Sequence, residues 1–254
     1  MFKRLCSAEP IEVYKSTNDM LEGWFGFSRQ ASKNIVKAFE FDPKNFLYYR
    51  SRAITADVPN SNGDCFPKEE LEKAYKTFIG KGVFYEHASD DPENSFGIIL
   101  DANFVQPSGK NAYVEILCAV DRQLAEQKYP GLVHRVESGM LSGTSMGAVA
   151  GGAKCGICGN YTTTLEGLCA HMNPDSTGYV KGKLINASTN EYGFEYNYHI
   201  TFVEDSLVNC PADSTAQIFE VYAANKDKLD VNNPNKEVIS NLIQALQGML
   251  KSIK

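Results

Sequence analysis

The chain has 254 residues, of which 43% are hydrophobic and 22% are charged, and its formal net charge at pH 7 is −6. This length and composition suit one medium globular domain with additions, or two small domains. Because there is no basic surplus to neutralise phosphates, we expect no nucleic-acid partner. The apolar runs are too short to cross a bilayer, and no apolar segment follows the first basic residues. We therefore expect no membrane partner and no signal peptide.

Aromatic, β-branched and turn-forming residues predict the elements of the first half of the chain. A helix is expected within residues 24–41, and a strand at 46–58. Proline, asparagine, glycine and aspartate then cluster in a turn at 59–67. An apolar face at i, i+3, i+4 and i+7 predicts a helix over 67–80. Three strands separated by polar turns follow, at 83–87, 96–105 and 111–120.

The second half combines helical stretches with two further strands. Residues 121–138 are expected to be helical, and a strand that begins at 141 is expected to dissolve into glycines. Regular alternation predicts a long strand at 194–208, whereas 213–225 is predicted as a helix with Asp213 near its cap. Because strands and helices do not alternate regularly along the chain, we predict an α+β domain. Its core would be a mostly antiparallel sheet or barrel flanked by helices.

The C-terminal region divides into a polar linker and an amphipathic helix. Residues 225–237 are polar and contain proline, which is typical of a linker. In the tail, 238–254, apolar residues step by 3, 4, 3 and 4 and form a seam: Ile239, Leu242, Leu246, Met249 and Ile253. A helix this short is marginal alone, so we expect it to dock on its own domain or on a partner.

Three cysteines and one histidine form the pattern Cys155-x2-Cys158-x10-Cys169-x-His171. Three thiolates and an imidazole make a tetrahedral ligand set with no position open for water, which is typical of structural rather than catalytic zinc. Crowded cysteines in a chain without an export signal favour metal binding over disulfides, and they place the protein in a reducing cytoplasm. We therefore predict a structural zinc ion that pins a glycine-rich insertion at 151–180.

Ser145 lies in the pentapeptide Gly143-Thr144-Ser145-Met146-Gly147, which matches the G-x-S-x-G pattern of a nucleophile elbow. That elbow needs a helix after the serine, and the glycine-rich continuation is not helical. The order of its triad also needs a late histidine. We therefore reject an α/β-hydrolase. The structural alternative is a serine in a tight turn or a buried strand.

A serine hydroxyl needs a base to take its proton, and that base needs a third group to orient it. His87 closes the predicted strand 83–87, where a side chain can face a cleft. Glu204 and Asp205 are neighbours in the predicted strand 194–208. Because neighbouring strand residues face opposite sides, only one of them can face a given site, and the alternation does not settle which.

Four sequence blocks together resemble the tailed-bacteriophage prohead (head-maturation) proteases. They are NSNGDCFPKEELEKAYKTFIGKGVFYEH, the serine in S-M-G, C-x-x-C-G with C-x-H, and F-x-E-x-S-L-V-x-x-P-A-D. The resemblance covers about residues 50–220. That family shares the herpesvirus assemblin fold, an antiparallel β-barrel wrapped by helices. The resemblance thus implies a protease domain at 46–224, after an N-terminal extension at 1–45.

The resemblance also implies roles for the matching residues. Ser145 matches the nucleophile, His87 the general base and Glu204 the third member. His199 is a rival for the third place, because the herpesvirus branch has a second histidine there, and Asp205 is a weaker rival.

Two further assignments depend on the same resemblance. Ser142 is the fallback nucleophile, although x-Gly does not follow it. The sequence contains no arginine after Arg135 that could serve as an oxyanion clamp. Backbone N–H groups around Met146 and Gly147 are the candidates instead.

The implied activity is serine-type hydrolysis of peptide bonds inside an assembling procapsid in the host cytoplasm. Implied substrates are scaffold or core proteins, the major capsid protein and the protease itself. The segments MLEGW and TTLEGL are candidate self-cleavage sites. A homo-oligomer is compatible with this interpretation. The alternatives are a non-catalytic structural capsid protein that keeps the fold, and a zinc-knuckle binding module.

Overall fold

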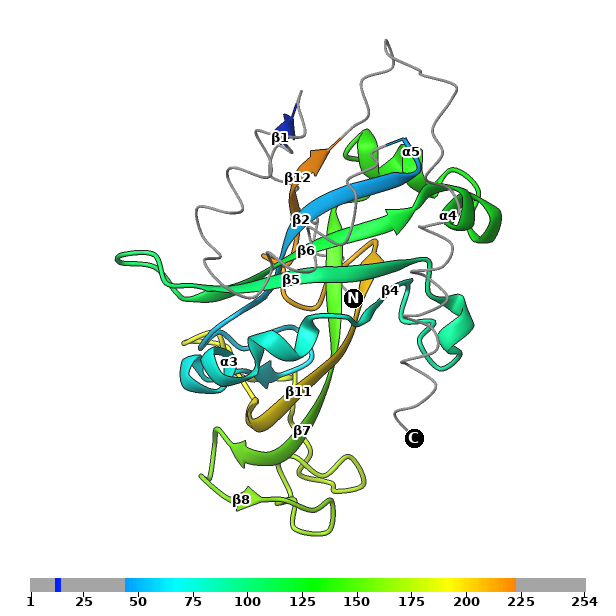
Figure 1. Cartoon of the computed structure of the whole chain (residues 1–254). Coiled ribbons are helices and arrows are strands. Elements are labelled where there is room, and N and C mark those ends of the chain that lie inside the picture. Colours follow the sequence, from blue (N-terminus) through cyan, green and yellow to red (C-terminus); the bar gives the residue numbers. More distant parts are fainter. Residues whose placement is uncertain (1–11, 15–43, 223–254) are drawn as a thin grey trace.

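The computed structural model of the chain describes residues 12–14 and 44–222 (Figure 1). Its framework is a ten-stranded sheet in the order β1-β12-β2-β6-β5-β4-β11-β7-β8, with β3 beside β11. Most neighbouring strands are antiparallel, but β11 runs parallel to β3 and β4, and β1 runs parallel to β12. A separate small sheet pairs β9 with β10. The strands are β1 (Glu12–Tyr14), β2 (Phe46–Thr55), β3 (Asp64–Cys65), β4 (Gly82–Tyr85), β5 (Gly97–Val105), β6 (Tyr113–Asp121), β7 (Gly143–Cys155), β8 (Tyr161–Thr162), β9 (Leu184–Asn186), β10 (Glu191–Tyr192), β11 (Glu195–Val208) and β12 (Ile218–Tyr222).

The centre of the sheet is formed by β2, β6 and β5, which correspond to the strands predicted at 46–58, 111–120 and 96–105. These strands pair antiparallel over most of their length. Their aromatic and β-branched side chains are mostly buried in one hydrophobic core. Burial of apolar surface contributes about 25 cal/mol per Å², so this core is the main stabilising element of the domain.

One predicted helix, at 67–80, is present as α3 (Lys68–Ala74), which continues into the 3₁₀ helix η1 (Tyr75–Phe78). A second, short 3₁₀ helix, η2 (Pro92–Asn94), follows β4. The ring of Phe78 stacks on Phe202 of β11, with ring centroids 3.9 Å apart and an interplanar angle of 10°. This contact fixes the end of the helix against the strand.

The helical stretch predicted at 121–138 consists of two helices, α4 (Arg122–Lys128) and α5 (Leu132–Glu137). Asp121 caps α4 by accepting a hydrogen bond from the backbone N–H of Leu124. The interruption falls at Pro130-Gly131, because proline cannot continue a helix and Gly131 has a left-handed backbone with φ of 81°.

The helix predicted at 213–225 is wrong, since residues 218–222 form strand β12 on the edge of β2. Asp213 does not cap a helix. Its carboxylate accepts hydrogen bonds from the backbone N–H groups of Thr55 and Thr215. Local propensity could not reveal this strand, because it forms through pairing with the distant strand β2. In that pairing, the side chains of Ile218 and Val221 are buried.

The strand predicted from residue 141 does not dissolve among its glycines. It continues as β7 to Cys155, because β11 pairs with it along its whole length. In Figure 1 these two strands run together from the body of the sheet to the region around β8. Glycine weakens an isolated strand, but a continuous partner compensates for this.

The α+β class and the mostly antiparallel sheet are confirmed, but the described strands do not form a closed barrel. The first residues of β7 do curl back toward the start of β12. An isolated bridge joins Gly143 to Gln217, and the N–H of Thr144 donates to the carbonyl of Ala216. This contact does not extend into a ladder, so the sheet stays open there.

Several predicted segments lie outside the described residues: the helix within 24–41, the linker 225–237 and the amphipathic tail 238–254. Of the extension 1–45, residues 12–14 and 44–45 are described, and 12–14 form strand β1. In the part of the chain that the structure covers, no helix has both the length and the apolar character needed to traverse a bilayer.

We predict that Phe202→Ala lowers the free energy of unfolding by about 3–5 kcal/mol, because it removes a fully buried ring and its stacked partner contact. Val203→Ala is the matched control, since Val203 is 42% exposed on the other face of β11. Urea denaturation measures both. Equal effects for the two variants would contradict the described orientation of β11.

Candidate active site

The candidate nucleophile Ser145 lies on β7, directly opposite Ser206 of β11. Two residues further along the same ladder, Gly147 lies opposite Glu204. Because side chains alternate along a strand, these four positions share one face of the two-stranded ribbon. The pairing of β7 with β11 therefore brings a hydroxyl and a carboxylate together from positions 59 residues apart in the sequence.

The glycine of the S-M-G segment gives the Glu204 carboxylate its space. A Cβ atom on Gly147 would lie 2.6 Å from Oε1 and 2.8 Å from Cγ of Glu204. Since Glu204 is only 2% exposed, its side chain has little room to move aside. An S-x-G spacing is thus a physical requirement here, because the serine projects from the face on which the glycine must leave a gap.

His87 completes the cluster from another part of the sheet. Its Nδ1 lies 2.9 Å from Oε1 of Glu204, and its Nε2 lies 3.0 Å from Oγ of Ser145. Ser206 donates a 2.6 Å hydrogen bond to the other carboxylate oxygen of Glu204. The imidazole therefore bridges the buried acid and the hydroxyl, with both ring nitrogens within hydrogen-bonding distance of a partner.

The sequence predicted that His87 is the last residue of a strand, but in the structure it lies beyond the strand. Strand β4 ends at Tyr85, and Glu86 and His87 follow with positive φ angles of 48° and 59°. Left-handed backbone is unfavourable for residues with a Cβ atom, and it persists only where surrounding contacts hold it.

Contacts from β11 and α5 hold this turn in place. The N–H of Glu86 donates to the carbonyl of Leu207, and the Glu86 carboxylate accepts hydrogen bonds from the N–H and side-chain amide of Asn209. Arg135 in turn donates a 2.7 Å hydrogen bond to the Asn209 side chain. Sequence reasoning missed this network, because its members come from three distant segments and match no short motif.

The rivals for the third position lie elsewhere. Asp205 is fully buried on the opposite face of β11, where burial, and secondarily the charge of Glu204, raise the pKa of its carboxyl well above the usual value. His199 is exposed near the far part of the ribbon, where its backbone N–H bonds to Glu70. Ser142, the fallback nucleophile, precedes β7, and its carbonyl accepts a hydrogen bond from the backbone of Ile218.

A cleft of about 250 Å³ opens beside Ser145. Phe66, Ala148 and Ala150 supply apolar parts of its lining. A polar wall comes from the loop before and within β3, with Asn60, Asn62 and Asp64. The cleft is thus adjacent to the hydroxyl and partly open to solvent.

Chemically, the cluster can activate a serine hydroxyl. The hydrogen bond to Glu204, supported by the charge of that carboxylate and opposed by partial burial, raises the pKa of His87 above its ordinary value. A buried carboxylate beside Nδ1 also fixes the ring so that Nε2 faces Ser145. That the backbone N–H groups of Met146 and Gly147 donate hydrogen bonds to an oxyanion remains a prediction.

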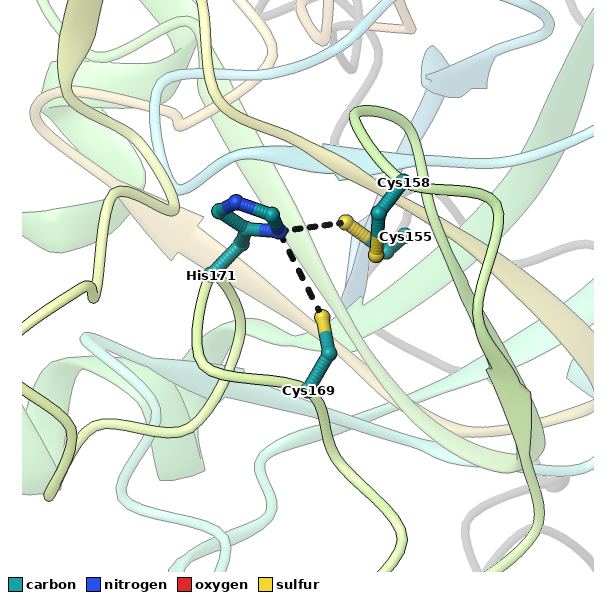
Figure 2. Close-up of side chains that lie close together, drawn as sticks. All are labelled: Cys155, Cys158, Cys169 and His171. Carbon is teal, nitrogen blue, oxygen red and sulfur yellow. Dashed lines mark hydrogen bonds between the residues drawn. The ribbon is translucent and has the colours of Figure 1, made fainter.

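The second predicted cluster, Cys155, Cys158, Cys169 and His171, also comes together (Figure 2). The four potential ligand atoms lie within 4.8 Å of one another, and Nδ1 of His171 lies 3.9 and 3.8 Å from the sulfurs of Cys155 and Cys169. Ligands about 2.0–2.3 Å from a tetrahedral zinc ion lie roughly 3.5–3.8 Å apart. The residues therefore fit a closed zinc site, as the sequence predicted.

The two clusters occupy opposite ends of one strand. Ser145 and Cys155 are separated by ten residues of β7, or about 33 Å along an extended strand. The insertion between β7 and β11 covers 156–194, rather than the predicted 151–180, because residues 151–155 still belong to β7; within it, β8 pairs with the end of β7. A metal there is too far from the hydroxyl to take part in its chemistry.

Comparisons with known proteins add little to this description. No protein-family model and no curated protein sequence match the chain. Among solved structures, it is similar to the bacteriophage T4 capsid assembly protease gp21, with 17% sequence identity and a TM-score of 0.38, over 63% of this chain and 80% of that chain. A similarity at this level does not establish a common fold.

We expect the reaction of Ser145 with diisopropyl fluorophosphate to rise with pH through a midpoint above about 6.5, the ordinary value for histidine. Only the neutral ring can accept the serine proton, and Glu204 raises the pKa of His87. Glu204→Gln should lower this midpoint and reduce the plateau rate about 10²-fold or more.

Glu191→Gln, which changes an exposed carboxylate in the insertion, is the matched control and should leave both quantities unchanged. The measurement is the labelling rate by mass spectrometry across a pH series. An identical midpoint in wild type and Glu204→Gln would show that the acid does not act on His87.

We also predict that the purified chain binds about one zinc ion, because the ligand set is complete. Cys158→Ser and Cys169→Ser should each lower the zinc content severalfold, whereas Cys210→Ser, an exposed cysteine outside the cluster, should not. Elemental analysis measures the content. Equal zinc in all variants would rule out this site.

Proposed function

We propose that this protein is a serine endopeptidase, with Ser145 as nucleophile, His87 as general base and Glu204 as the residue that orients the base. The observation that carries the proposal is the continuous hydrogen-bonded chain from Ser145 Oγ through the imidazole to the Glu204 carboxylate, at 3.0 and 2.9 Å. Distances of this size allow direct proton transfer from the hydroxyl to the ring.

The protonation states follow from the partners. A carboxylate can only accept, so Nδ1 carries the proton and donates it to Glu204, and Nε2 accepts from the serine. Ser145 Oγ attacks the peptide carbonyl carbon while its proton passes to Nε2. The resulting imidazolium is stabilised by Glu204 and gives that proton to the leaving amine.

The acyl-enzyme is released by the reverse sequence. His87 takes a proton from water, the hydroxide attacks the ester carbonyl, and the proton returns to Ser145 Oγ as the C–O bond breaks. The second hydrogen bond to Glu204, from Ser206, keeps the carboxylate fixed through both halves of the reaction. Zinc in the Cys3His cluster has a structural role in this proposal.

The biological setting comes from the sequence resemblance to prohead proteases. We propose that the substrates are scaffold or core proteins, the major capsid protein and the chain itself, and that cleavage occurs inside the assembling procapsid in the host cytoplasm. One candidate self-cleavage site is compatible with access, because Glu166 and Gly167 lie in an exposed turn of the insertion. The other, in residues 20–24, lies outside the described residues.

The test is coexpression with the capsid and scaffold proteins encoded with this chain, followed by gel analysis and mass mapping of the products. Ser145→Ala should reduce processing by about 10⁴-fold or more, to an undetectable level. Ser142→Ala is the matched control and should process normally, since Ser142 lies outside the hydrogen-bonded chain.

Each outcome decides between the alternatives. Loss of processing only in Ser142→Ala would move the nucleophile to that residue. Identical band patterns for wild type and Ser145→Ala would favour the non-catalytic alternative, a structural capsid-associated protein that retains the arrangement without turnover.

A further inference from the structure

The insertion that carries the candidate metal ligands makes a further contact with the main sheet, through Lys181, ten residues after His171. Lys181 extends its ammonium group to Asp64 of β3, at 2.7 Å, and to Glu195 at the start of β11, at 2.5 Å. All three side chains are largely buried, with 19, 23 and 12% of their surface exposed. One cation from the insertion therefore serves two carboxylates of the main sheet.

The two carboxylates belong to directly paired strand positions. In the parallel pairing of β3 with β11, Glu195 is the Cα partner of Asp64. Like charges at paired positions destabilise a ladder, and partial burial strengthens the repulsion. The short strand β3 has only two residues, so it has few other hydrogen bonds with which to offset that repulsion.

The backbone of the insertion also packs closely against the loop that precedes β3, since a Cβ atom on Gly182 would lie 3.2 Å from the carbonyl oxygens of Ser61 and Asn62. Gly63 has φ of 80°, and a Cβ atom there would lie 2.5 Å from the N atom of Gly182. The first residue of β11 holds the same loop, because Glu195 donates its N–H to the carbonyl of Gly63. Within the insertion, Lys181 forms an isolated bridge with Gly193.

The same loop forms the polar wall of the cleft beside Ser145. Asn60, Asn62 and Asp64 line that cleft, and Oδ1 of Asn60 accepts the N–H groups of Asn62 and Asp64. Asn197 of β11, which also lines the cleft, donates to Asp64. The position of the wall thus depends on where Asp64 is held.

The insertion is connected in turn to the candidate metal site. The carbonyl of His171 accepts a hydrogen bond from the N–H of Val180, the residue before Lys181. This hydrogen bond links the residue next to Lys181 directly to a candidate metal ligand. Lys183, two residues further on, is oriented differently, because its ammonium bonds to the carbonyl of Tyr179 in an exposed position.

We propose that Lys181 is a positioning residue for substrate binding: it neutralises the Asp64–Glu195 pair and so holds the Asn60–Asp64 wall of the cleft in its binding conformation. The predicted effect on substrate binding rests on the proposed peptidase function, whereas the predicted effect on the cleft wall does not. The insertion then has a role in recognition of the polypeptide substrate, and metal binding supports that role from a distance.

The first test is hydrogen–deuterium exchange of the segment 58–66 in the full chain. Lys181→Met keeps the length of the side chain and removes its charge, so the backbone of Asn60–Asp64 should exchange about tenfold faster. Lys183→Met should exchange like wild type. The double variant Lys181→Met with Glu195→Gln removes the repulsion and should restore much of the protection.

The zinc content decides whether the effect is direct. Lys181→Met should keep the wild-type zinc content, and a loss of zinc in this variant would overturn the proposal in favour of a role within the metal site. Wild-type exchange in Lys181→Met would also overturn it. Neither readout requires proteolysis, so both stand even where no protein substrate is cleaved.

The kinetic test uses a synthetic peptide that spans the cleavage site mapped in the coexpressed capsid protein. Lys181→Met should raise KM about tenfold and change kcat less than about twofold, since the Lys181 ammonium pairs with Asp64 and Glu195 and not with the hydrogen-bonded chain at Ser145. A fall in kcat with an unchanged KM would overturn the positioning role. Failure of wild type to cleave any capsid or scaffold protein would instead remove the proposed function.

Discussion

The site depends on the register between β7 and β11. Only this pairing sets Ser145 beside Ser206 and Gly147 beside Glu204 on one face. A slip by one residue would turn every side chain of a strand to the opposite face, which would separate the hydroxyl from the acid. The same register continues to the other end of the ribbon, where Cys155 pairs with Glu195. The candidate catalytic cluster and the candidate metal cluster thus lie on one ribbon that is held by one set of backbone hydrogen bonds.

A β-bulge in β11 decides which carboxylate enters the site. Phe202 pairs with Ala148, but Glu204 pairs with Gly147, so Val203 is an extra residue in the ladder. A bulge shifts the alternation by one position. Before it, Phe202 faces the core, and after it Asp205 does so, which leaves Glu204 on the face of Ser145. If β11 kept a regular alternation through Val203, with no bulge, Glu204 would share the face of Phe202 and point into the apolar core.

Sequence patterns predicted the central strands, α3 and the long strand β11, because these segments bury apolar side chains with a regular period. They could not choose between Glu204 and Asp205, since an alternation broken by a bulge fits either residue. The helix predicted at 213–225 was wrong for a related reason, because pairing with β2 overrides local propensity. The ligand cluster was easier to predict, as its four residues lie close in sequence.

The composition of β7 explains why its far end needs additional anchors. Residues 148–151 are small and exposed, so they contribute little apolar burial beyond their pairing with β11. Backbone hydrogen bonds alone contribute modestly to net stability in water. The candidate ligand set that includes Cys155 lies where the insertion begins, and the ion pair of Lys181 with Glu195 lies where it rejoins β11. Because strand pairing is cooperative along a ribbon, anchors at that end also limit the fraying that would loosen the hydroxyl and acid at the other.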